Sequence, residues 1–232
     1  MSGWPDLNTE NSLPFSPFRL LLLMAALIFF IIFVQLGAIS IAFEKLGLSD
    51  HSAYLLLFAT LVGSMVNLPL MSIESNSTGR PPQGFFRGGR AMFAPEFMDG
   101  KTHILVNVGG ALIPFAFSLY LLVHHPISLL DVSLSVGLVS ALAHALSRPV
   151  PGVGIGMPMF IVPVAAALIA SFLAPEQRAP LAYISGSLGV LVGADLTRLK
   201  DIRNLGAPLA SIGGAGTFDG IFLAGFLAVL LA

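Results

Sequence analysis

The sequence predicts an all-α, polytopic membrane protein whose helices pack as a bundle. Of its 232 residues, 56% are hydrophobic and only 10% are charged, whereas about 25% charged residues are typical of soluble domains. The mean hydropathy is +0.90. The apolar residues form continuous runs long enough for helices of roughly 20 residues, and they lack the alternating pattern of a transmembrane β-barrel.

Apolar runs bounded by charged residues, Pro or Gly predict about seven transmembrane helices. They cover residues 20–43, 53–72, 103–123, 127–146, 158–174, 181–197 and 207–232. Residues 1–19 then form an N-terminal tail, and residues 20–232 form a single transmembrane domain with a long loop at about 73–102. The first run follows a polar stretch with only Arg19 as a basic residue, so we expect an anchored span and no cleaved signal peptide.

The distribution of basic residues predicts the orientation of these helices. Nine of the eleven Lys and Arg residues fall in the tail and in the second, fourth and sixth loops, while Lys45 and Arg178 fall on the opposite side. Because positively charged loops stay in the cytoplasm, we expect a cytoplasmic N-terminus, a cytoplasmic loop at about 73–102 and an external C-terminus. The Phe and Arg residues of that loop fit either a solvated linker or a segment on the anionic inner leaflet.

The composition also excludes several classes of function. The chain has no Cys, which excludes disulfides, thiolate metal sites and cysteine nucleophiles. A net charge of −1 argues against binding to nucleic acid. No pair of His and acidic residues has the spacing of a metal site, so we expect neither a metal nor a cofactor. The lipid bilayer is the expected partner, and any chemistry must come from a few polar side chains.

Two acidic residues lie inside apolar runs, where each needs an explanation because a charge in hydrocarbon is unfavourable. They are Asp195 in LVGADL and Asp219 in GGAGTFDG. We expect them on consecutive antiparallel helices. They lie at the same depth in the membrane only if the last helix begins well after residue 207, closer to Asp219. The glycines at 213, 214 and 216 favour such a late start, since clustered glycine weakens a helix and permits close backbone approach.

Other polar or helix-breaking residues are expected near the same leaflet. They are Asn67, His103, Asn107 and His144, together with the stretch from Ser147 to Pro163, which contains Pro149 and Pro151. This stretch has too many Pro and Gly residues for a regular helix, so we expect an extended or broken entry to the fifth span. Each polar residue alone fits an interhelical hydrogen bond as well as a role in binding substrate.

Two carboxylates held close together in an apolar site share a proton, and such a pair can supply both a general base and a general acid. The motifs GAD at 193–195, which includes Gly193, and GGAGTFDG at 213–220 resemble the two-aspartate site of the GxGD intramembrane aspartyl proteases, the presenilin and signal peptide peptidase superfamily. The resemblance implies Asp195 and Asp219 as the catalytic pair and membrane-embedded peptides as substrates. It covers roughly the last 50 residues, which lack the family's Tyr-Asp and later Pro-Ala-Leu motifs.

As a whole, the chain resembles an uncharacterised prokaryotic multi-pass family, which implies an inner-membrane location in a prokaryote. Two other functions stay open. One is a proton- or cation-coupled transporter, because two short motifs occur twice in the same order. Leu61-Val62-Gly63 is followed by Val108-Gly109-Gly110-Ala111, and Leu191-Val192-Gly193 is followed by Ile212-Gly213-Gly214-Ala215. Such a repetition would suit a parallel 3+1+3 helix repeat. A membrane scaffold without catalytic activity, in which the acids bind helices together, is the third possibility.

Overall fold

The computed structural model describes residues 24, 37–74, 101–150, 154–204, 209–214 and 220–232. The chain divides into two units, Met1–Ser40 and Ile41–Ala232. The elements labelled below all belong to the second unit, while the helix Gly37–Lys45 spans the boundary between the two units. The predicted tail at 1–19 lies outside the described residues, and so does nearly all of the predicted loop at 73–102.

The second unit is mostly helical, as predicted. Its α-helices are α2 (Asp50–Gly63), α3 (Ile113–His124), α4 (Leu129–Leu146), α5 (Ile161–Leu173), α6 (Arg178–Val190) and α7 (Gly220–Leu231). Short turns join them: the π-helical η3 (Val108–Leu112) and η5 (Leu191–Leu196), and the 3-10 turns η4 (Pro175–Gln177) and η6 (Asp201–Asn204). Serine side chains cap α2 and α4, where Ser49 and Ser128 accept hydrogen bonds from the amides of Ser52 and Leu130.

The all-α prediction was incomplete, because the described residues also include five strands, which form two small sheets. Strands β1 (Asn67–Glu74), β2 (Lys101–Asn107) and β5 (Leu209–Ile212) make a sheet in the order β1-β2-β5, with β1 antiparallel and β5 parallel to β2. Strands β3 (Arg148–Val150) and β4 (Gly154–Gly156) pair antiparallel. The second pair shows that the Pro-rich stretch after Ser147 is extended at Arg148–Val150 and Gly154–Gly156.

Three predicted helices therefore give way to strands over part of their length. Residues 67–72, 103–107 and 209–212 are extended, so Asn67 and His103 lie on strands and the seventh helix does not begin at 207. Pro69 explains the first case, because its ring clashes with the preceding turn of a helix. β-Branched residues at 102, 104 and 106 favour a strand in the second case.

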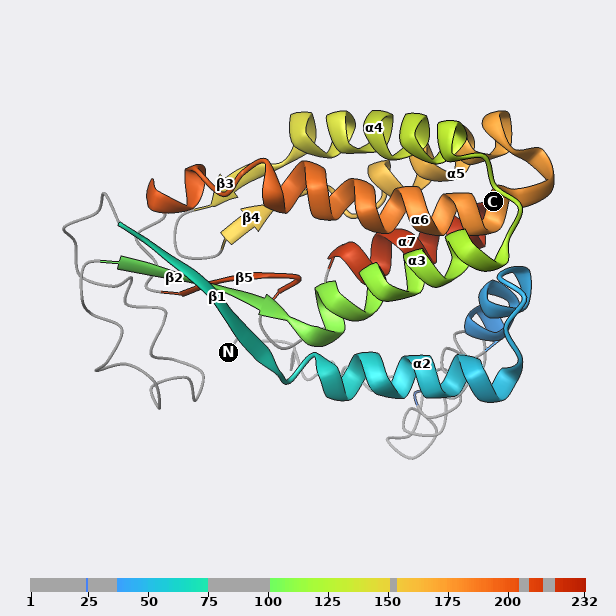
Figure 1. Cartoon of the computed structure of the whole chain (residues 1–232), viewed down its shortest axis with the longest axis horizontal. Helices are drawn as coiled ribbons and strands as arrows, with labels where there is room; N and C mark the ends of the chain where they lie inside the picture. Colours follow the sequence, from blue (N-terminus) through green and yellow to red (C-terminus); the bar gives the residue numbers. More distant parts are fainter. Residues whose placement is uncertain (1–23, 25–36, 75–100, 151–153, 205–208, 215–219) are drawn as a thin grey trace, which may run out of the picture. The chain divides into compact units, whose positions relative to one another are not determined.

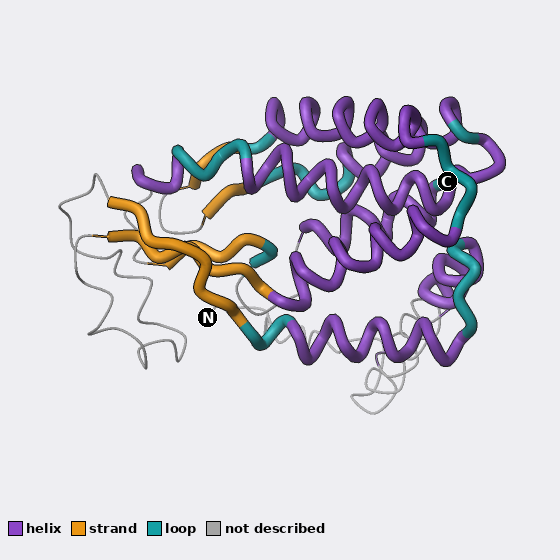
Figure 2. Tube along the Cα trace, viewed as in Figure 1, coloured by secondary structure: helices purple, strands orange, loops and turns teal. Residues whose placement is uncertain are grey.

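The helices and strands alternate in three hairpin units along the chain. In each of these three segments a helix is followed by one or two strands and then by a second helix: α2-β1-β2-α3, α4-β3-β4-α5 and α6-β5-α7. All the strands consequently lie at one end of the helices, as Figures 1 and 2 show. The turn η3 lies directly between β2 and α3, and η5 ends α6 before the 3-10 turn η6 and strand β5.

Helix α6 lies at the centre of the bundle and packs against α3, α4, α5 and α7 (Figure 1). Nearly every residue of α6 is buried, including Leu181, Tyr183 and Ile184. Large apolar side chains on the outer helices are exposed instead, such as Phe58 at 65% and Phe172 at 83%. An apolar interior with an equally apolar exterior is what a bilayer as solvent requires.

Two described helical stretches are long and apolar enough to cross a membrane, Leu129–Leu146 and Pro175–Leu196. A third candidate exists if the bent pair Gly37–Lys45 and Asp50–Gly63 counts as one span. Helices α3, α5 and α7 are apolar but shorter than a full span. The described part of the chain thus gives two or three spans by helix length, and the number seven stays a prediction.

Glycines allow several of these helices to meet backbone to backbone. A Cβ atom at Gly109 in η3 would collide with backbone atoms of Thr60 and Ser64, so glycine at this position lets η3 pack directly on the end of α2. A Cβ atom at Gly186 would come within 2.9 Å of the Ala224 carbonyl oxygen on α7. Gly137 on α4, in contrast, has open space around it.

We expect Gly186→Ala to destabilise the protein and Gly137→Ala to leave it intact. The added methyl at 186 must push α7 away from α6, and overpacking of this kind costs about 1–3 kcal/mol. At 137 the methyl meets nothing, and alanine favours a helix over glycine by about 1 kcal/mol. Thermal unfolding in detergent, followed by circular dichroism, compares the two variants. Equal Tm values for both would contradict the close α6–α7 packing.

Candidate functional site

Asp195 lies where α6 ends in the π-helical turn η5. The wider turn is visible in the hydrogen bond from the Thr197 amide to the Val192 carbonyl oxygen, at 3.0 Å and five residues apart. The side chain of Asp195 is half-buried and has hydrogen-bonding partners. Single π-helical turns within α-helices are rare and are frequent at functional sites.

Gly193 sets the position of this turn by packing directly on α4. A Cβ atom at residue 193 would collide with the backbone of Ser140, including its carbonyl oxygen. One turn earlier, a Cβ atom at Gly189 would lie 2.5 Å from Cγ1 of Val139. Glycine at both positions lets the last turns of α6 approach α4 more closely than any other residue would.

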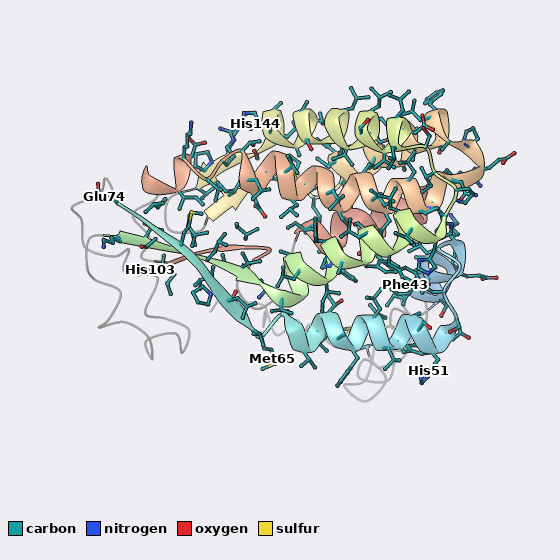
Figure 3. The ribbon with its side chains drawn as sticks, viewed as in Figure 1. Phe43, His51, Met65, Glu74, His103 and His144 are labelled. Carbon is teal, nitrogen blue, oxygen red and sulfur yellow. The ribbon has the colours of Figure 1, made fainter. Side chains whose placement is uncertain are left out.

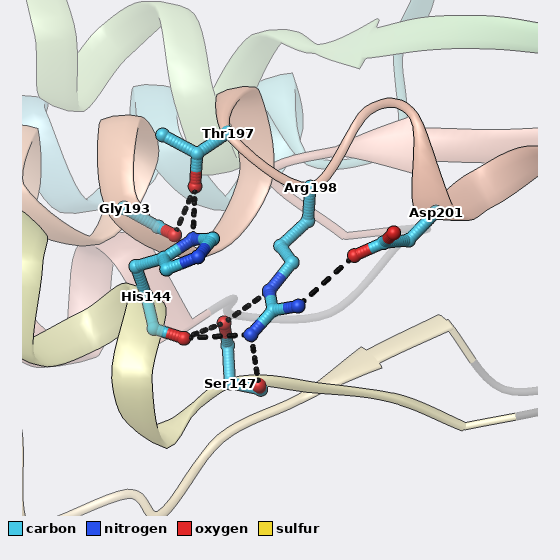
Figure 4. A network of polar contacts seen from close by, with 6 residues as sticks. All are labelled: His144, Ser147, Gly193, Thr197, Arg198 and Asp201. Atoms are coloured by element: carbon cyan, nitrogen blue, oxygen red, sulfur yellow. Dashed lines mark hydrogen bonds and ion pairs between the residues drawn. The ribbon is translucent and has the colours of Figure 1, made fainter.

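A hydrogen-bonded chain ties His144 on α4 to the same turn (Figure 4). The Thr197 hydroxyl donates to the Gly193 carbonyl oxygen at 2.6 Å, and Nδ1 of His144 lies 2.7 Å from that hydroxyl oxygen. Since a hydroxyl has one proton to donate, Nδ1 of His144 must be the donor in the second bond. The imidazole ring is exposed, so His144 supports η5 from the surface and does not reach Asp195 through this chain.

Arg198 fastens the end of α6 to the end of α4 (Figure 4). Its Nη2 donates to the carbonyl oxygens of His144 at 2.8 Å and Ser147 at 3.0 Å, and its Nε donates to Oγ of Ser147 at 3.2 Å. Its Nη1 forms an ion pair with Asp201 at 3.0 Å. A cation on the last carbonyl groups of a helix is favourable because these carry the negative end of the helix dipole.

On its other side, Asp195 contacts the glycine turn that follows β5. The Gly213 amide donates to Oδ2 of Asp195 at 3.4 Å. Gly213 and Gly214 have φ angles of +79° and +77°, a region that glycine alone adopts readily. A Cβ atom at Gly213 would also lie 2.6 Å from the Ala111 amide nitrogen in η3. Three chain segments therefore meet around the Gly213 amide: η5, the glycine turn after β5, and η3.

Asn107 and Asn67 hold the neighbouring strands in place. Asn107 is fully buried; its Oδ1 accepts from the Gly110 amide at 2.7 Å, and its Nδ2 donates to the Ser64 carbonyl oxygen at 2.7 Å. Nδ2 of Asn107 also lies 3.2 Å from Oδ1 of Asn67, which accepts from Oγ of Ser211 at 2.7 Å. Satisfying a buried amide in this way fixes β1, β2 and β5 relative to one another.

The structure thus brings together many of the predicted site residues, but not all of them. Asp195 and Gly193 lie in η5, His144 is linked to this turn through Thr197, and the Gly213 amide donates to Asp195. Asn107 and Asn67 belong to a neighbouring set of hydrogen bonds, which Ser211 joins to β5 two residues before Gly213. Pro149 lies elsewhere, exposed on β3 opposite Ile155. Asp219, Gly216 and Pro151 lie outside the described residues, and α7 is described from Gly220 onward.

The sequence analysis missed several polar residues of this region. Thr197, Arg198 and Asp201 follow Asp195 closely, while Ser147 ends α4 and Ser211 lies two residues before Gly213. Arg198 was counted only as a cytoplasmic charge. Its spacing of three residues from both Asp195 and Asp201 is a signal that could have been read, whereas its partners on α4 lie some fifty residues away.

Chemically, the described part of the site offers one half-buried carboxylate beside backbone amides and a π-helical turn. Such a carboxylate can act as a proton acceptor or hold a cation, and a second acid is required to supply a proton at the same place. Within the described residues, no three His, Asp or Glu side chains gather as they would around a metal ion.

Comparison with known proteins gives a family and no activity. No curated protein matches the chain, and no solved structure does. A family described as "Protein of unknown function (DUF1614)" matches residues 61–231, a range that includes every site residue discussed above. Because this match covers most of the length of the chain, the chain belongs to the DUF1614 family.

Proposed function

We propose that the chain is an intramembrane aspartyl endopeptidase in which Asp195 and Asp219 form the catalytic pair. The observation that carries the proposal is the contact between Oδ2 of Asp195 and the Gly213 amide. It joins the first acid to the start of the glycine segment that leads, six residues later, to the second. This contact would be absent if η5 and the glycine turn lay at different depths.

In this proposal the pair shares one proton, as two neighbouring carboxylates must at low polarity. The ionised carboxylate takes a proton from water as the water oxygen attacks the peptide carbonyl carbon. The protonated partner donates its proton to the carbonyl oxygen. The first acid then passes the proton that it took from water to the nitrogen as the C–N bond breaks, and a hydroxyl group of the intermediate returns a proton to the partner, which releases the amine and a carboxylic acid. The turn η5 and the glycines at 213 and 214 would provide the irregular backbone that an extended substrate needs beside the acids.

The membrane arrangement belongs to the same proposal. We propose seven crossings with the N-terminus inside and the C-terminus outside, in the inner membrane of a prokaryote, on the basis of the nine-to-two distribution of basic residues. Helices shorter than a full span would complete their crossings through the adjoining turns and strands. The substrates would be membrane-embedded peptides, whose scissile bond must reach the level of Asp195.

A proton- or cation-coupled transporter is a second candidate, favoured by one structural observation. Strands β2 and β5 pair in parallel, and each runs into a glycine pair that precedes a helix. The π-helical turn η3 begins the helical stretch that follows β2, and η5 ends the one that precedes β5. Related halves with broken helices are common in secondary transporters, where an acid beside the break binds the coupling ion.

We expect Asp195→Asn and Asp219→Asn each to abolish cleavage of a single-span reporter by the purified, reconstituted protein. Loss of a general acid or base lowers the rate by roughly 10²–10⁴-fold. The matched control is Asp131→Asn, an acid in the first turn of α4, at the opposite end of that helix from His144. It should cleave like the wild type. Equal cleavage by all four proteins, or none by any of them, would contradict the protease proposal.

The transporter makes a different prediction for the same variants. Vesicles containing the wild-type chain should show no solute uptake driven by a pH gradient if the protein is a protease. Uptake by the wild type that is lost in Asp195→Asn and kept in Asp131→Asn would replace the protease with the transporter. A pH-sensitive dye inside the vesicles measures the accompanying proton flux.

A further inference from the structure

Exposed apolar side chains continue along the chain from helix α2 onto strand β1. Its main members are exposed by 45–80% and are Phe58, Leu61, Met65, Leu68, Leu70 and Met71. We call these six residues the α2–β1 apolar surface. Figure 3 shows Met65 at the junction of helix and strand and Glu74 at the far end of β1. Large exposed apolar patches of this kind mark a surface that is covered in the working protein.

The charges around this surface point to a bilayer as its cover. Residues 51–73 contain no Asp, Glu, Lys or Arg. The run ends at Glu74, which the strand register places opposite Lys101. A charge-free segment that begins in a helix, crosses into a strand and stops at a pair of opposite charges has the polarity profile of a chain leaving a membrane.

The length of α2 gives a second, independent reason. Its 14 residues extend about 21 Å at 1.5 Å per residue, whereas the hydrocarbon core is about 30 Å thick. The three residues that join α2 to β1, numbers 64–66, supply at most about 10 Å at 3.3 Å each, and less where they turn. The edge of the hydrocarbon therefore falls near the start of β1 and not at the end of α2.

The backbone of β1 suits this boundary and not the middle of a bilayer. Within the described residues, β1 is the end strand of its sheet, and unpaired backbone groups are not tolerated in hydrocarbon. Pro69 removes one donor from the strand, and a bulge interrupts its pairing between Pro69 and Met71. Near the headgroups, water can reach the groups that remain.

From these observations we infer that the α2–β1 apolar surface is covered by lipid, with Leu68, Leu70 and Met71 inserted into the acyl-chain boundary of the bilayer. This inference rests on the membrane-spanning part of the proposed function and not on its chemistry. The strand register also assigns a depth to the candidate site. Ile212 pairs with Val106, so Gly213 follows at about the level of Asn107, which pairs with Asn67, the first residue of β1. Asp195, whose Oδ2 accepts from the Gly213 amide, therefore lies close to the boundary, within about 10 Å of headgroup level.

The absence of Cys in the chain permits a direct test with single spin labels. Phe58→Cys, Leu70→Cys and Glu74→Cys all replace exposed side chains, so the fold should be kept; Met71→Cys is a second reporter for the strand. Each labelled full-length protein is reconstituted in phosphatidylcholine vesicles. Collision of the label with oxygen, which dissolves in lipid, is compared with collision with a water-soluble nickel complex by electron paramagnetic resonance.

We expect the labels at 70 and 71 to lose most of their nickel collisions, as the label at 58 does, while the label at 74 keeps them. Nickel collisions at 70 and 71 equal to those at 74 would overturn the inference. So would spin–spin broadening at 70 that disappears on dilution with unlabelled protein, because a second copy would then cover the surface. If the label at 58 also meets nickel freely, the membrane-spanning proposal fails as well, whereas loss of the protease proposal alone leaves these results unchanged.

Discussion

The backbone contact between Gly193 and Ser140 is the constraint on which the arrangement at the end of α6 depends. Only glycine fits there, and the resulting closeness of α6 to α4 lets Arg198 reach the last carbonyl groups of α4 and lets His144 reach Thr197. The π-helical turn between these contacts directs Asp195 to the opposite side, toward the Gly213 amide. Positioning of the acid is thus a consequence of backbone packing.

The sequence predicted helices correctly at 127–146 and 181–197, apolar runs that contain no Pro and correspond to α4 and α6. It was wrong at 67–72, 103–107 and 209–212, since hydropathy alone does not distinguish an apolar strand from an apolar helix. The local signals were present: Pro69 is incompatible with a helix interior, and β-branched residues alternate along β2. What no local signal could supply is the parallel pairing of β2 with β5, which joins segments about a hundred residues apart.

Some residues of the candidate site could be recognised from the sequence and others could not. Asp195 and Gly213 were recognisable, because an acid and a glycine cluster inside apolar runs both conflict with a regular membrane helix. Thr197 and Arg198 were not, since a hydroxyl and a cation at the end of a span look like ordinary surface residues. Their roles arise only from contacts with α4, and sequence spacing carries no information about such contacts.

The change from helix to strand near Asp195 has a consequence for any hydrolytic function. Water is a reactant in peptide hydrolysis, and a carboxylate at the centre of a bilayer would have little of it. The buried contacts of Asn107, with Asn67 and Ser211 beside it, are polar groups at the level of Gly213. A site at that level has the hydrogen-bonding groups of the strands beside it. A membrane peptide would meet both water and the acid where its own helix must unwind, so the depth of the strands, more than the length of the helices, would determine which bond is reached.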